Sequence, residues 1–181
     1  MEGSSSVLED ALAQFLLQIQ TAPTGEHRQA ATAAVLEAIA SHVLKNPGPD
    51  SNPAALVVVR DAFTALLSEL GPTGDARQLR DCLLSLLSRV PSSNSDTQKL
   101  LLGLLPSAML PDEAELFVTQ KVISTLRGLL ERDLSPLLPV LECLALLPGE
   151  RNEAYLQIAL DALPVVQGKD LPKLVQSLLR H

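Results

Sequence analysis

The chain has 181 residues, of which 46% are hydrophobic, and its formal net charge is -7. It contains 39 leucines but only three phenylalanines, one tyrosine and no tryptophan, so we expect an aliphatic core of helices packed on helices rather than strands. Because an acidic surface repels phosphate backbones, the composition argues against a strong duplex-DNA binder acting alone.

Prolines and glycines divide the sequence into nine stretches in which apolar residues recur with a helical period. Helices are therefore predicted near residues 5–21, 26–45, 53–70, 75–90, 96–105, 112–132, 135–147, 150–163 and 171–181. Asn52 is expected to cap the third helix, with Pro53 at its first position. Ser135 with Pro136 is expected to start the seventh helix, and Asp170 to cap the ninth.

The helix predicted at 112–132 has the clearest amphipathic pattern. One side of its helical wheel carries Leu116, Val118, Val122, Ile123, Leu126, Leu129 and Leu130. The other side carries Gln120, Lys121, Ser124, Arg127 and Glu131. Phe117 is an exception, because it points toward the polar side. Acidic residues between 112 and 115 are expected in the first turn, where the helix dipole favours negative charge.

Short loops between these helices predict antiparallel neighbours. Each helix is too small to bury its apolar stripe alone, and stacked pairs solve that problem. We therefore predict an all-α fold, an α-solenoid of about nine helices in HEAT/ARM-like antiparallel pairs, with a closed helical bundle as the alternative. Residues 1–181 form a single helical-repeat region in this interpretation. The last helix is still strongly apolar at its end, which favours a fragment of a longer solenoid.

Motifs for catalysis or ligand binding are mostly absent from the sequence. It has no GxxxxGK[ST] and no GxGxxG, the patterns that cradle phosphates. His27, His42 and His181 have no HExxH or CxxC partner, so no metal ligand is assigned. His27 and His42 are expected at the surface of the second helix. We expect a protein that is not an enzyme, with no catalytic residue, no cofactor, no metal and no small-molecule ligand.

The remaining reactive and basic side chains have structural interpretations. Cys82 and Cys143 lie inside apolar helical runs and are expected as reduced core residues, although a disulfide between them stays open. The most basic segment runs from Arg77 to Arg80 and is followed at once by Asp81, so it is expected to form a solvated helix face.

No segment has the features of a membrane anchor or a secretory signal. The first ten residues are acidic and Ser-rich. The longest charge-free apolar stretch, Leu100 to Pro111, is broken by Gly103 and Pro106, whereas a membrane span needs ~20 apolar residues. We expect a cytosolic or nuclear protein with no membrane contact.

Four features of the second half of the chain occur in a distinctive order. A short helix ends in Leu105–Pro106, an acidic loop leads into the helix at 112–132, a Leu-rich helix carries PVLECLALL at 139–147, and an Asp-Leu-Pro step at 170–172 opens an apolar helix. Over residues 98–181 this string resembles the N-terminal helical region of the Fanconi anaemia group D-two protein family.

The resemblance implies an α-solenoid that works in the nucleus in the repair of DNA interstrand crosslinks. In that family, two paralogues pair and close around duplex DNA, and monoubiquitination of one lysine in each locks the clamp. The implied partner is the Fanconi anaemia group I paralogue, with DNA bound only in the full complex. None of the lysines of this chain lies in the sequence context of the family's acceptor: Lys45, Lys99, Lys121, Lys169 and Lys173.

The alternative is a generic HEAT-like adaptor in protein transport or complex assembly. Under that interpretation a cytoplasmic location stays open. The ordered string over residues 98–181 distinguishes the two, because a generic adaptor has no reason to carry all four features in order.

Overall fold

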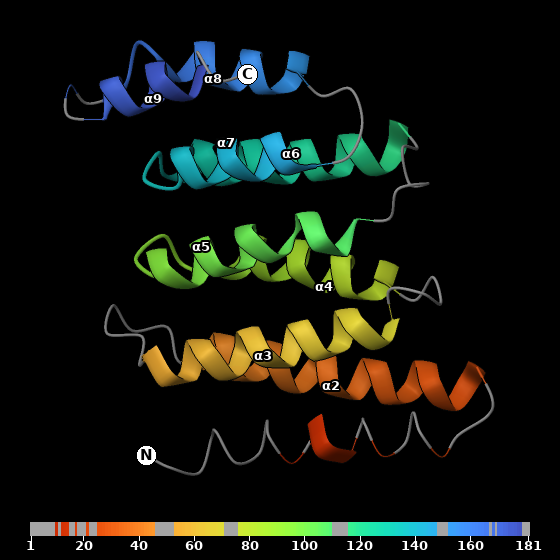
Figure 1. The fold of residues 1–181 in the computed structure, drawn as a ribbon. Coiled ribbons are helices and arrows are strands. Elements are labelled where there is room, and N and C mark those ends of the chain that lie inside the picture. The colour runs from red at the N-terminus through yellow and green to blue at the C-terminus, as the bar shows by residue number, and fades with distance from the viewer. Residues whose placement is uncertain are drawn as a thin grey trace.

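The computed structural model describes residues 10, 12–14, 17, 21, 25–45, 53–70, 76–109, 116–147, 152–166, 168 and 170–178 (Figure 1). This part of the chain contains helices and no strand, which confirms the all-α class there. The elements are α2 Gly25–Lys45, α3 Pro53–Leu70, α4 Ala76–Arg89, α5 Ser95–Leu104, the 3-10 turn η2 Pro106–Ala108, α6 Leu116–Arg132, α7 Leu137–Leu146, α8 Asn152–Ala162 and α9 Leu171–Leu178.

The predicted helix bounds agree with the structure to within two residues for α2, α3, α4, α5, α7 and α8. The short turn η2 was not predicted. Several predictions lie outside the described residues: most of the helix at 5–21, the Asn52 cap, the acidic residues at 112–115, the side chain of Phe117 and the end of the last helix. The residues described at 10, 12–14, 17 and 21 are helical.

The start of α7 differs from the prediction, because the helix begins at Leu137 with Pro136 in the capping position. The Asp133 carboxylate accepts hydrogen bonds from the Ser135 backbone N–H at 2.9 Å and from the Ser135 hydroxyl at 2.8 Å. Ser135 is thus held in a turn before the helix, so the first helical bond runs from the Val140 N–H to the Pro136 carbonyl at 2.9 Å.

Buried polar side chains hold the turn between α4 and α5. Asn94 is the N-cap of α5, and its side-chain oxygen accepts a hydrogen bond from the Thr97 N–H at 3.4 Å. The Gln98 amide donates to the carbonyl of Pro91 at 3.5 Å. Because the side chains of Asn94 and Gln98 are buried, these bonds replace the water that their polar groups lose on folding.

Consecutive helix pairs lie at successive levels from the N-terminus to the C-terminus, as Figure 1 shows for α2 with α3, α4 with α5, α6 with α7 and α8 with α9. Most helices also contact the helix two positions further along the chain. One row of contacts joins α2 to α4 and α4 to α6, and the other joins α3 to α5, α5 to α7 and α7 to α9. Helices two apart therefore lie side by side in each row.

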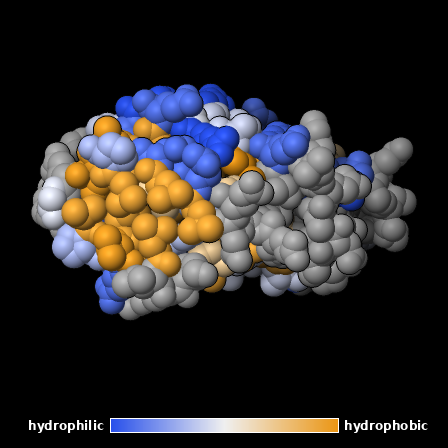
Figure 2. Space-filling model, turned by 90° about the horizontal axis from the view of Figure 1, so that it is seen from above, coloured by the Kyte–Doolittle hydropathy of each residue, from blue (hydrophilic) through white to orange (hydrophobic). Residues whose placement is uncertain are grey.

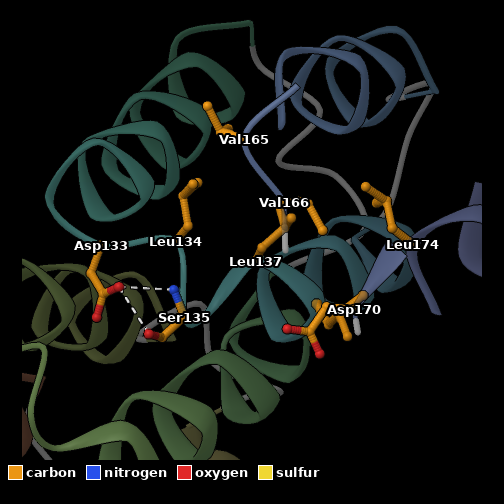
Figure 3. A pocket seen from close by; sticks show the side chains of 9 residues that line it. Asp133, Leu134, Ser135, Leu137, Val165, Val166, Asp170 and Leu174 are labelled. Atoms are coloured by element: carbon orange, nitrogen blue, oxygen red, sulfur yellow. Dashed lines mark hydrogen bonds between the residues drawn. The ribbon is translucent and has the colours of Figure 1, made fainter. Parts of the chain in front are cut away.

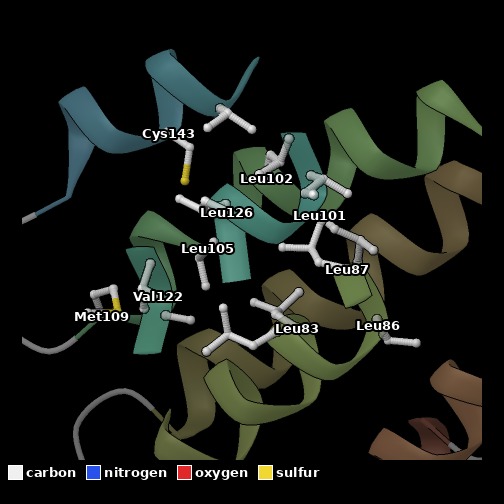
Figure 4. Packing of buried hydrophobic residues seen from close by; sticks show 14 of the residues in the cluster. Leu83, Leu86, Leu87, Leu101, Leu102, Leu105, Met109, Val122, Leu126 and Cys143 are labelled. Carbon is white, nitrogen blue, oxygen red and sulfur yellow. The ribbon is translucent and has the colours of Figure 1, made fainter. Parts of the chain in front are cut away.

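One hydrophobic cluster runs through these levels from Ala31 in α2 to Leu174 in α9. Figure 4 shows its middle part, where Leu83 and Leu87 of α4 face Leu101 of α5 and Leu126 of α6. The predicted apolar side of α6 is confirmed from Val122 onward, because Val122, Leu126 and Leu129 are buried while the predicted polar residues are exposed. The side chains of Leu116 and Val118 lie outside the described residues. The cluster is almost wholly aliphatic; Phe63 and Tyr155 are the aromatic residues in it.

Candidate functional site

The part of the chain that the structure describes contains no group of three or more His, Cys, Asp or Glu side chains that could hold a metal ion. The side chain of His27 and all of His181 lie outside that part. His42 was expected at the surface, and this prediction was wrong, because only 6% of the residue is exposed. His42 follows Ile39 by three positions and Val35 by seven, so it shares their buried side of α2.

The predicted basic face on α4 is correct for Arg77, which is exposed, and wrong for Arg80, which is 6% exposed. The helix contacts α2 on one side and α6 on the other, so its buried surface is wider than one stripe. Asp81 stands 3.6 Å from the Arg80 Nε and 3.0 Å from the Lys121 Nζ of α6. Asp81 therefore links two neighbouring helices of one row.

Both cysteines are free thiols, as expected, and the disulfide alternative is not realised. Cys143 is buried, and Cys82 is half-buried with its Sγ 3.9 Å from the Leu36 carbonyl oxygen. Burial raises the pKa of the Cys82 thiol to about 11. At neutral pH this thiol stays protonated, so it is a poor nucleophile.

The features behind the family resemblance occupy packing positions. Leu105 is fully buried, and the PVLECLALL segment buries Val140, Leu141, Cys143, Leu144 and Leu147. At the Asp-Leu-Pro step, the Asp170 carbonyl accepts the first helical bond of α9 from the Leu174 N–H at 3.1 Å. These residues hold helices together.

Two adjoining clefts lie among the described residues near the C-terminal helices. The larger, of about 290 Å³, lies between the loop that joins α6 to α7 and the loop that joins α8 to α9. Figure 3 shows Asp133 and Asp170 at opposite edges of this cleft, with Leu137 and Val166 between them. The smaller, of about 210 Å³, lies between α6 and α8. Leu134 lines both clefts, and we call them together the α6–α8 groove.

Next to the groove, α8, α9 and the segment between them expose large apolar side chains. Figure 2 views the molecule from this side and shows hydrophobic residues gathered in a broad area. The exposed residues, which we call the C-terminal apolar face, are Leu156, Leu160, Val165, Leu171 and Val175. The groove and this face meet at Val165, which is 60% exposed and also lines the larger cleft.

Sequence reasoning missed the groove because its lining residues come from two segments, 127–138 and 158–174, that only the fold brings together. A signal was nevertheless present. Glu131 and Asp161 stand in the last turns of α6 and α8, where the helix dipole disfavours negative charge. The dipole makes both positions unfavourable for an acid, although the Gln157 amide offsets part of this at Asp161 with a 2.8 Å hydrogen bond. An acid at such a position is a reason to suspect a role outside folding.

Comparisons with protein-family models, with curated proteins and with solved structures find no match to this chain. In the described helices, none combines the length and the apolar character that crossing a membrane requires.

Proposed function

We propose that this chain is a non-catalytic helical scaffold, an α-solenoid of HEAT-like antiparallel pairs that acts in DNA interstrand crosslink repair in the manner of the Fanconi anaemia group D-two family. The observation that carries the proposal is the order of four packing features over residues 98–181: the Leu-Pro helix end, the long helix behind an acidic loop, PVLECLALL and the Asp-Leu-Pro step.

The contacts between helices support the solenoid part of this proposal. In a solenoid each repeat touches its neighbours, whereas the helices of a closed bundle surround a common axis. Contacts between α2 and α4, α4 and α6, α3 and α5, and α5 and α7 follow the first pattern. The open surfaces of such an array serve as binding surfaces for proteins.

The partner implied by the resemblance is the Fanconi anaemia group I paralogue, and DNA enters only through the assembled pair. The net charge of -7 agrees with a scaffold wall better than with a surface that grips phosphates unaided. A nuclear location and control by ubiquitin belong to the same proposal.

A pull-down of the tagged protein from cells, before and after treatment with a DNA crosslinker, tests the proposal. We expect mass spectrometry to recover the group I paralogue, with a ubiquitin-shifted band of the tagged protein after damage. Untagged cells treated in the same way are the control for carry-over. Recovery of coat, import or other assembly factors, with no change on damage, overturns the repair assignment.

That second outcome supports the alternative, a helical adaptor in transport or complex assembly. The observation in its favour is that all four features occupy packing positions, which any stacked helical array requires.

A further inference from the structure

Apolar side chains lie on the floor of the α6–α8 groove: they dominate the lining of the smaller cleft and form a lesser part of the lining of the larger one. Leu134 separates the two clefts and is 37% exposed, although it is a large aliphatic residue in a loop. Leu130 and Ile158 extend this floor into the smaller cleft, and Val165 extends it to the outer edge of the larger one. A groove of this kind accepts the apolar side chains of a peptide or a helix.

The charge at the rim is one-sided. Glu131 and Asp161 line the smaller cleft, and Asp133 and Asp170 line the larger one. Among the described residues that line either cleft, Arg127 is the one basic side chain. The nearby Arg132 is engaged elsewhere, because its guanidinium donates to backbone carbonyls of α4.

The C-terminal ends of two helices add to the negative electrostatic potential at the smaller cleft. Both α6 and α8 reach the cleft with their last turns, so their exposed carbonyl groups carry partial negative charge there. Asp133 accepts the two hydrogen bonds that hold the Ser135 turn, and Asp170 directly precedes α9, where the helix dipole favours a carboxylate, so these two have a structural reason to be present. Glu131 and Asp161 stand at helix C-termini, where the dipole disfavours them, and Asp161 is held there by a 2.8 Å hydrogen bond from the Gln157 amide. Both carboxylates therefore face the smaller cleft at an unfavourable end of the helix dipole, which makes them the informative pair.

We propose that the α6–α8 groove docks a basic amphipathic helix of another protein. Its leucine-type side chains lie against Leu134 and Val165, and a lysine or arginine lies between Glu131 and Asp161. The apolar floor supplies affinity, and the carboxylates speed association and select for basic partners. This surface does not depend on the repair assignment, because the clefts and charges that carry it belong to this chain alone.

Fluorescence anisotropy of the full chain with a labelled helical peptide made only of leucine and lysine tests the proposal at physiological salt. We expect the double variant Glu131→Lys with Asp161→Lys to bind the peptide at least tenfold more weakly than the unaltered chain. The matched control is Glu37→Lys with Asp61→Lys, two exposed carboxylates on α2 and α3. It changes the net charge equally and is expected to change binding less than twofold. Equal weakening by both pairs, or no binding of the peptide, overturns the proposal.

A second pair of variants tests the apolar floor without altering charge. Leu134→Ser is expected to weaken peptide binding about fivefold, whereas Val57→Ser, on α3 and 43% exposed, leaves it unchanged. Circular dichroism of each variant confirms that it folds. Sedimentation velocity of the unaltered chain and of Leu134→Ser decides whether the groove binds a partner helix or a second copy of the chain. If the unaltered chain forms a dimer and Leu134→Ser abolishes it, the groove binds a second copy and the proposal is overturned.

Discussion

Cys82 lies on α4 where that helix meets α2, and its thiol is the reactive group whose chemistry burial changes most clearly. Burial excludes most of the water that would stabilise a thiolate there, and the thiol donates a weak hydrogen bond to the Leu36 carbonyl oxygen 3.9 Å away. The pKa of Cys82 therefore rises from 9.0 to about 11.

We predict slow alkylation of Cys82 in the folded protein. In a Cys143→Ala background, iodoacetamide at pH 8 is expected to react about a hundredfold more slowly than with a peptide thiol, since the thiolate fraction falls tenfold per pKa unit. The rate continues to rise with pH above 9.0, whereas in urea it matches the peptide. A rate that levels off near pH 9 in the folded protein contradicts the prediction.

The same shift makes stability depend on alkaline pH. The pKa of Cys82 is higher in the folded protein than in the unfolded chain. The protonated thiol therefore makes its full contribution to the free energy of unfolding below pH 9.0, and this contribution is lost as the pH rises toward about 11. The free energy of unfolding is expected to fall over this window, and less steeply in Cys82→Ala. Urea titrations at several pH values, compared between the two proteins, measure the difference.

Leu126 is fully buried between α4, α5 and α7, where Figure 4 places it among other core residues. We predict that Leu126→Asp lowers the free energy of unfolding by about 4 kcal/mol or more, because a buried carboxylate loses its water and the core loses a leucine. Urea unfolding followed by circular dichroism measures this. Ser124→Asp, on the exposed side of the same helix, is the control and is expected to stay within about 0.5 kcal/mol.

At the scale of elements, α6 stabilises the end of α4 through one side chain. The Arg132 guanidinium donates to the carbonyl of Ser88 at 2.8 Å and to that of Leu87 at 3.2 Å. Both carbonyls stand in the last turn of α4, where no further helical partner is available to them. A positive charge at that position also complements the helix dipole.

Arg132→Met is predicted to reduce stability by about 1 kcal/mol, since the side chain is exposed and solvent weakens its charge interactions. For a domain of this size the melting temperature falls by about 2–4 °C. Arg60→Met removes an exposed arginine whose bond reaches only the adjacent Asp61, and its effect is expected to be smaller. Equal melting temperatures for the two variants contradict the capping role.

The helices could be predicted from the sequence because prolines, glycines and apolar spacing are local signals. The burial of His42 and Arg80 could not, since it depends on which helices lie on either side of α2 and α4. The α6–α8 groove was also inaccessible to sequence reasoning, because Leu134 stands in a loop and its partners lie some 30 residues away along the chain. Local pattern determines the elements, and contacts between distant segments determine the site.

At the scale of the whole molecule, the helix pairs stack in levels, and the apolar side chains of one level pack against those of the next. The level of α8 and α9 lies at one end of the described stack, and its outer side presents the C-terminal apolar face (Figure 2). Monomeric proteins rarely leave contiguous apolar areas of a few hundred Å² in water, and such areas commonly mark interaction sites.

We predict that the purified 181-residue chain associates with itself through this face. Sedimentation velocity is expected to show a sedimentation coefficient that rises with protein concentration. Leu160 is 54% exposed on α8, and Leu160→Asp is expected to weaken the association at least tenfold, because a two-fold dimer places the altered residue in its interface twice. Val57→Asp adds the same charge to an exposed apolar position of α3 and is expected to leave association unchanged. The prediction is contradicted if the chain stays monomeric at every concentration, or if both variants lose self-association equally. Either result shows that the apolar side chains of α8 and α9 do not hold two copies together.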